Sequence, residues 1–84
     1  MITRHQCKAA RALVEMKQVD LAEAAGLSKQ TLVDFERGAR TPHRNHLAAI
    51  QAALEAAGVE FIPENGGGPG LRLKKGPSEP PSDQ

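Results

Sequence analysis

Apolar residues recur at helical spacing in two short segments at the start of the chain. Thr3 and Gln6 have the spacing of a capping box, and the apolar positions behind them predict a first helix over about residues 4–16. A shorter pattern stops at Gly26, a residue type that tolerates the left-handed conformation in which many helices end. A second helix is therefore predicted over about residues 18–25.

Two more helices are predicted in the middle of the chain. Ser28 is a residue type that caps helix N-termini, and an apolar pair at i and i+3 behind it predicts a third helix over about residues 29–37. Pro42 forces an extended or turning backbone at Thr41, and the amphipathic stripe that follows predicts a fourth helix over about residues 45–57.

After the fourth helix the pattern changes from helical spacing to short apolar runs. Two runs, over residues 59–62 and 71–73, flank a turn-rich stretch with four glycines and predict two short strands. Because an isolated two-stranded ribbon is only marginally stable, we expect it to pack on the helices or on a second subunit. Residues 74–84 are rich in Pro, Ser and charge, which is typical of a disordered tail. The sequence thus predicts one domain over residues 1–73.

Composition narrows the class of protein. The chain has 84 residues, enough for one small core, and it lacks Tyr and Trp. Cys7 is the only cysteine, which excludes an intrachain disulfide and any zinc site that needs two thiolates. Neither a signal peptide nor a run long enough to span a bilayer is visible. We therefore expect a soluble, cytoplasmic protein with no membrane partner.

Charge is informative through its distribution and not through its total. The formal net charge is only +1. Residues 26–46 carry four basic and two acidic side chains, whereas residues 47–70 carry three acidic and no basic ones. One basic and one acidic region are expected if one end of the domain faces phosphates.

The run Q-V-D-L-A-E-A-A-G-L-S-K-Q-T-L-V-D-F-E-R-G, which begins at Gln18, resembles the helix-turn-helix of phage repressors and of the wider Xre family of bacterial regulators. The resemblance implies a mainly α, lambda-repressor-like four-helix DNA-binding domain, with the motif over residues 18–37 and a short C-terminal β-hairpin or strand pair. Six positions match the small, turn and wedge residues of the motif: Leu21, Ala22, Gly26, Leu27, Leu32 and Phe35.

The resemblance places the third helix in the major groove of double-stranded DNA, where its N-terminal side chains meet base edges first. Lys29 and Gln30 are then the favoured base readers, since Lys donates to guanine and Gln pairs with adenine. Thr31 and Val33 can offer methyl contacts to thymine, and Asp34 can accept from cytosine N4 or repel other bases. A solvated surface helix has the same division of polar and apolar faces, so it is the preceding helix and the glycine turn that favour DNA reading.

Phosphate contacts are expected around this helix. The resemblance places Gln18 near the DNA backbone at the start of the second helix, and Arg40 with Arg44 in or after the loop that follows the third. Ser28 and Arg37 complete the predicted phosphate contacts, although an arginine read in isolation is more often a solvated charge. By the same resemblance, Arg11 and Glu36 form an ion pair that orients the third helix.

Other chemistry is sparse. The spacing of the three histidines does not suggest a metal site, and Cys7 is predicted to be a small core residue. The glycine run lacks the Lys-Ser/Thr pair and the following helix of a phosphate-binding loop, so we interpret it as a hairpin tip. We expect no cofactor, no metal and no enzymatic activity.

The sequence therefore predicts a sequence-specific DNA-binding transcriptional regulator, a repressor associated with the nucleoid. We expect a homodimer through residues 59–73 or the fourth helix, because one recognition helix rarely supplies enough contacts. The alternative is an antitoxin or adaptor whose main role is to bind a partner protein, with DNA binding used for autoregulation.

Overall fold

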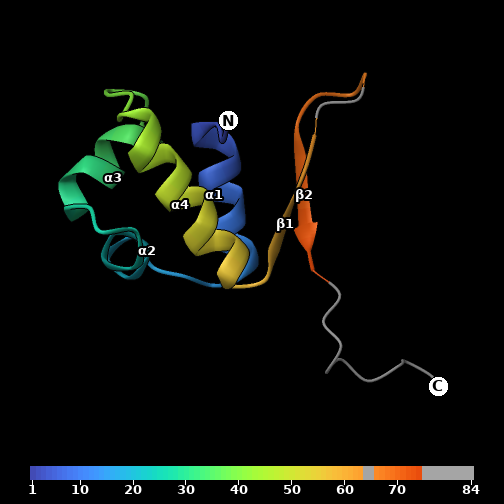
Figure 1. Cartoon of the computed structure of the whole chain (residues 1–84), viewed down its shortest axis with the longest axis horizontal. Helices are drawn as coiled ribbons and strands as arrows, with labels where there is room; N and C mark the ends of the chain where they lie inside the picture. Colours follow the sequence, from blue (N-terminus) through green and yellow to red (C-terminus); the bar gives the residue numbers. More distant parts are fainter. Residues whose placement is uncertain (64–65, 75–84) are drawn as a thin grey trace.

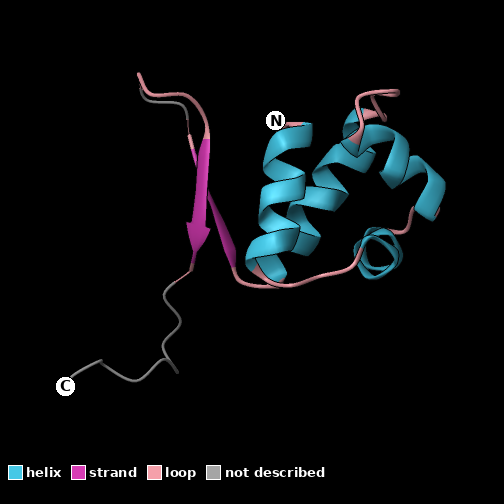
Figure 2. Ribbon diagram, turned by 180° about the vertical axis from the view of Figure 1, so that it is seen from behind, coloured by secondary structure: helices cyan, strands magenta, loops and turns pink. Residues whose placement is uncertain are grey.

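Four helices and one β-hairpin make up the computed structural model, which describes residues 1–63 and 66–74. The helices form one cluster, and the hairpin stands beside α1 and α4 (Figures 1 and 2). This arrangement confirms the predicted mainly α fold with a C-terminal strand pair. The elements are α1 (Arg4–Leu13), α2 (Gln18–Ala25), α3 (Lys29–Glu36), α4 (Arg44–Ala56), β1 (Val59–Ile62) and β2 (Gly70–Leu73).

The end of the first helix differs from the prediction. α1 stops at Leu13, three residues before the predicted end at Met16. Glu15 adopts a left-handed backbone with φ of 56°, and the N–H of Met16 donates to the carbonyl of Arg11 at 2.8 Å. A tight turn therefore replaces the last helical turn, at a residue type that carries no sequence signal for it. The other predicted ends agree with the structure to within one residue, and residues 75–84 of the predicted tail lie outside the described residues.

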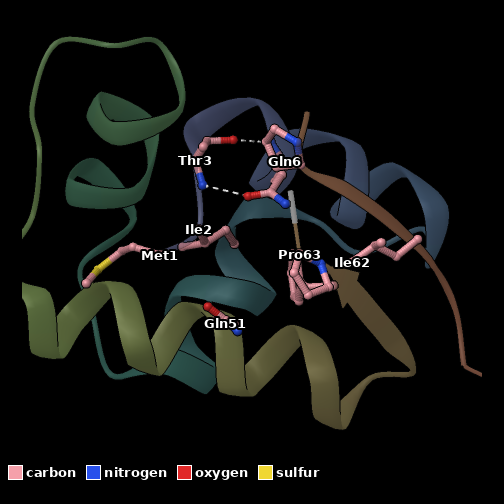
Figure 3. A pocket seen from close by; sticks show the side chains of 9 residues that line it. Met1, Ile2, Thr3, Gln6, Gln51, Ile62 and Pro63 are labelled. Carbon is pink, nitrogen blue, oxygen red and sulfur yellow. Dashed lines mark hydrogen bonds between the residues drawn. The ribbon is translucent and has the colours of Figure 1, made fainter. Parts of the chain in front are cut away.

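Helix capping follows the sequence closely. Thr3 Oγ1 accepts from the backbone N–H of Gln6 at 3.1 Å, and Gln6 Oε1 accepts from the N–H of Thr3 at 3.0 Å, so both bonds of the capping box form (Figure 3). Gly26 ends α2 with φ of 74°. Ser28 caps α3 by accepting from the N–H of Thr31 at 3.1 Å. Lys17 precedes α2 without a side-chain capping bond. Local hydrogen bonds thus set the starts of α1 and α3.

A small apolar core holds the helices together. Leu21 of α2, Leu32 of α3 and Leu54 of α4 are fully buried, and Phe35 is 6% exposed. Leu27, in the turn between α2 and α3, packs against this cluster from a half-buried position. The predicted wedge residues therefore anchor α3 on its inner side and leave the opposite side available. No helix in the part of the chain that the structure describes is long and apolar enough to cross a membrane.

The hairpin packs one face on the helices. β1 and β2 pair antiparallel with Phe61 opposite Leu71, and both side chains pack on the core. β1 contacts α4 and β2 contacts α1, where Gln6 Nε2 donates to the carbonyl of Gly70 at 3.2 Å. Glu60 and Arg72 form an exposed ion pair across the two strands. The ribbon is therefore stabilised by the helices of its own chain.

Candidate nucleic-acid interface

The helix α3 lies at the periphery of the helical cluster and follows α2 through a short turn (Figure 1). Lys29 and Gln30, in its first turn, are exposed, and Thr31, Val33 and Asp34 are half-buried. The first turn holds no acidic residue, so Lys29 stands beside the positive end of the helix dipole without local compensation. The outer side of α3 therefore offers donors and a positive field at its N-terminus.

Gln30 of α3 and Arg37, the residue directly after this helix, converge on the carboxylate of Asp34. Gln30 Nε2 donates to Asp34 Oδ1 at 2.9 Å, and Arg37 Nε donates to the same oxygen at 3.3 Å. The hydrogen bond from Gln30 is the largest cause that lowers the pKa of Asp34, and desolvation opposes it. The hydrogen bond from Arg37 and the charges of Arg37 and Arg40 keep the pKa below its ordinary value. Asp34 is therefore an ionised acceptor on the outer side of α3.

A second set of polar side chains links α3 to the loop and helix that follow. Arg40 Nη1 lies 3.3 Å from Thr31 Oγ1, which is 2.8 Å from Ser28 Oγ. A shallow groove beside them is lined by Thr31, Arg40, His43 and His46, and Arg44 is exposed at the start of α4. The fold thus gathers predicted phosphate contacts from α3, the loop and α4, together with His43 and His46, which are not among the predicted contacts.

Beneath this surface lies a buried carboxylate with donors from two other helices. Glu36 of α3 is 3% exposed, and Arg11 of α1 binds it through two bonds of 2.7 Å. Gln18 Nε2 of α2 donates to Glu36 Oε1 at 3.0 Å, and Cys7 Sγ donates to Oε2 at 3.1 Å. Burial raises the pKa of Glu36, but the hydrogen bonds from Arg11, Cys7 and Gln18 outweigh it, and the pKa lies below the ordinary value. The carboxylate therefore joins α1, α2 and α3.

Comparison with protein families identifies the architecture. A family model described as helix-turn-helix, HTH_3, matches residues 8–60, more than half of the chain. The chain belongs to the Xre, or lambda-repressor-like, helix-turn-helix family. The match covers α2 and α3, the two helices of the DNA-binding helix-turn-helix. No curated protein matches the chain.

Most predicted site residues of this helix-turn-helix protein lie around α3, but the side chains of two of them form hydrogen bonds within the protein. Gln18, predicted to contact phosphate, has its amide nitrogen bonded to Glu36. Ser28, in the same predicted group, caps α3. Arg37, Arg40 and Arg44 are all exposed near its C-terminal end and the start of α4.

Two residues near the motif have roles that the sequence analysis missed. Cys7 was predicted to be only a small core residue, yet its thiol is a donor to Glu36. Cys7 lies four residues before Arg11, so both are on one face of α1. This spacing could have indicated that Cys7, like Arg11, lies near Glu36. Arg4 Nη1 donates to the backbone carbonyl of Glu36 at 3.3 Å and lies against Gly38, whose φ is 84°. No spacing rule points to Arg4, because the contact joins elements far apart in sequence.

The Cys7 thiol gives a direct test of the buried cluster. Burial, and then the hydrogen bond to Glu36, raise its pKa far above the ordinary value, so the thiol stays protonated and donates. We expect Cys7→Ala to lower the free energy of unfolding by about 1–3 kcal/mol, because Glu36 loses a buried donor. Cys7→Ser, which keeps a donor, should lose less. Urea unfolding followed by circular dichroism measures both, and an equal loss in the two variants would show that the thiol contributes packing alone.

A further pocket lies on another part of the molecule. Met1 and Ile2, Gln6 of α1, Gln51 of α4 and Ile62 of the hairpin line it (Figure 3). None of the described side chains that line it is charged. In contrast to the groove beside Arg40, this pocket therefore offers no cationic side chain to a phosphate.

Proposed function

We propose that this helix-turn-helix protein is a sequence-specific transcriptional regulator, a repressor that reads the major groove of DNA with α3. The observation that carries the proposal is the two-sided character of α3: Leu32 is fully buried on the inner side, while the polar first turn is exposed. An α-helix fits the major groove of B-DNA, and base edges there distinguish all four base pairs. As a helix, α3 has the shape that fits the groove, and the exposed donors in its first turn can reach the base edges.

Lys29 and Gln30 are the leading base readers in this proposal, with methyl contacts from Thr31 and Val33. Lys29 stands at the first position of α3, where a cation is disfavoured by about 0.3–1 kcal/mol relative to a neutral side chain. A residue that opposes local stability at an exposed position is expected to serve function. The acceptors of a guanine edge, or a DNA phosphate, would supply the negative partner that Lys29 lacks in the first turn of α3.

Arg37, Arg40 and Arg44 are proposed to hold the DNA backbone. They surround the C-terminal end of α3 and the start of α4, and the groove beside Arg40 adds the rings of His43 and His46. Ser28 is also proposed to contact phosphate, through its hydroxyl. Gln18 is proposed to do so because it lies at the start of α2. Such contacts set affinity and register without choosing sequence.

A homodimer that reads two half-sites is part of the proposal, with the hairpin as its interface. The apolar side of α4 is used inside the chain, where Leu47, Ile50 and Leu54 are buried. Leu73 of β2, in contrast, is 56% exposed although its partner Val59 is fully buried. We place the dimer on the nucleoid because its proposed target is DNA. A concentration-independent monomer mass in sedimentation would contradict the dimer.

Selection of bound sequences from random DNA tests the proposal as a whole. We expect an enriched motif that contains an inverted repeat, since a symmetric dimer reads related half-sites. If no motif is enriched at moderate salt, the sequence-specific part of the proposal is wrong. An enriched motif without a repeat would support base reading and contradict the homodimer.

Readers and backbone contacts can be separated by two alanine variants. Gln30→Ala is expected to relax the preference at one base position, because it removes one reader. Arg40→Ala is expected to weaken binding to all sequences alike and to reduce the slope of log affinity against log salt by about one. Competition binding over a salt series measures both effects. Identical behaviour of the two variants would contradict the division of roles.

A further inference from the structure

We propose that Asp34 is a positioning residue that sets the base preference of Gln30 without touching a base itself. The inference rests on the proposed reading of the major groove by α3. In this proposal, the Asp34 carboxylate holds the Gln30 amide in one orientation, and this orientation makes Gln30 a reader of adenine. Asp34 thereby determines specificity through its neighbour, and the direct cytosine contact expected from the sequence is replaced.

The exposure of the two side chains supports this division. The Asp34 side chain is only 16% exposed, whereas Gln30 is exposed one helical turn nearer the N-terminus of α3. Gln30 and Arg37 approach Asp34 from either side along the helix and share its Oδ1 atom. A base edge would have to displace one of them to reach Oδ1, and the low exposure of the side chain limits access to the rest of the carboxylate, whereas Gln30 is exposed.

The chemistry of the two groups explains why the orientation matters. A glutamine amide can rotate by 180° and so exchange its donor and acceptor ends. An ionised carboxylate only accepts hydrogen bonds, so the end of the Gln30 amide that faces Asp34 has to be Nε2. The second Nε2 hydrogen and Oε1 remain available. These are the donor and the acceptor that pair with adenine N7 and N6 in the major groove.

The negative charge of Asp34 acts in the same direction. Guanine presents two acceptors, N7 and O6, in the major groove, and a nearby carboxylate disfavours them. Arg37 is bonded to Asp34 through Nε, and its side chain is 65% exposed. The carboxylate therefore orients Gln30 on one side and is partly neutralised by Arg37 on the other.

Four variants of the full chain test the inference by selection from random DNA, followed by competition binding. For the wild-type protein we expect an adenine preference of about tenfold or more at the position that Gln30→Ala relaxes. Asp34→Ala should lower the preference at the same position by at least about threefold. Asp34→Asn should retain most of it, because Arg37 Nε still requires an oxygen at that point. The double variant Gln30→Ala/Asp34→Ala should resemble Gln30→Ala alone.

Three outcomes would overturn the inference, and they are distinct from one another. If Asp34→Ala relaxes a base position other than that of Gln30→Ala, Asp34 reads a base itself. If Asp34→Ala leaves every preference unchanged, the contact with Gln30 is incidental. If the wild-type protein enriches no motif, the proposed function fails and the inference fails with it. Thermal melting of each variant provides the folding control, and Asp34→Asn conserves the shape of the side chain.

Discussion

Replacing Glu36 with alanine is expected to destabilise the protein by about 3 kcal/mol, the scale found when one partner of a buried ion pair is removed. The reason is that Arg11 loses both of its 2.7 Å bonds, and Gln18 and Cys7 lose their acceptor. For a domain of this size the loss corresponds to a fall in melting temperature of roughly 12–24 °C. DNA affinity should fall as well, because α3 is no longer tied to α1 and α2.

Glu60→Ala is a matched control, since Glu60 also pairs with an arginine but lies at the surface. Exposed ion pairs contribute little, so its melting temperature should change far less than that of Glu36→Ala. Similar losses in the two variants would contradict the structural role of the buried carboxylate.

The Glu36 cluster also predicts how stability depends on pH. The pKa of Glu36 is lower in the folded chain than its ordinary value. Its ionised form therefore contributes stability that is fully present above the unfolded pKa of about 4.3 and is lost as pH falls through the folded pKa. Glu36→Gln should differ most from the wild type near neutral pH and less under acidic conditions. Urea unfolding at several pH values measures this, and a difference that is independent of pH would contradict the assignment.

Leu32→Ala is expected to have an effect of similar size through the core. The side chain of Leu32 is fully buried on the inner side of α3, and truncation of a buried leucine costs about 2–5 kcal/mol, depending on how far the cavity collapses. Since small domains are only marginally stable, a large part of the population would be unfolded near 37 °C. Thermal and urea unfolding measure the loss directly.

Val19→Ala on α2 is the matched control for Leu32→Ala. Its side chain is 49% exposed and is absent from the buried core cluster. Surface substitutions of this kind usually change stability by no more than about 0.5 kcal/mol. If the two variants lose stability equally, Leu32 does not carry the packing of α3 that its burial indicates.

Local signals made several elements predictable from the sequence. The capping box at Thr3 and the left-handed Gly26 act within a few residues of chain, and both are present in the structure. The wedge residues of the motif could be read in the same way, because burial on one face of a helix leaves a spacing that recurs every three or four residues. The Gln30–Asp34 contact is also local, at i and i+4, and its direction follows from a carboxylate that only accepts, although coordinates were needed to show that the bond forms.

By itself the sequence determined the four helices, the glycine turn and the polar outer side of α3, since each depends on residues close together in the chain. Only the tertiary structure decided that α1 ends at Leu13 and that Cys7 and Gln18 share the carboxylate of Glu36. Those bonds join residues 29 and 18 positions apart. A spacing rule describes neighbours within one element, whereas the donors that a buried carboxylate finds depend on how separate helices pack.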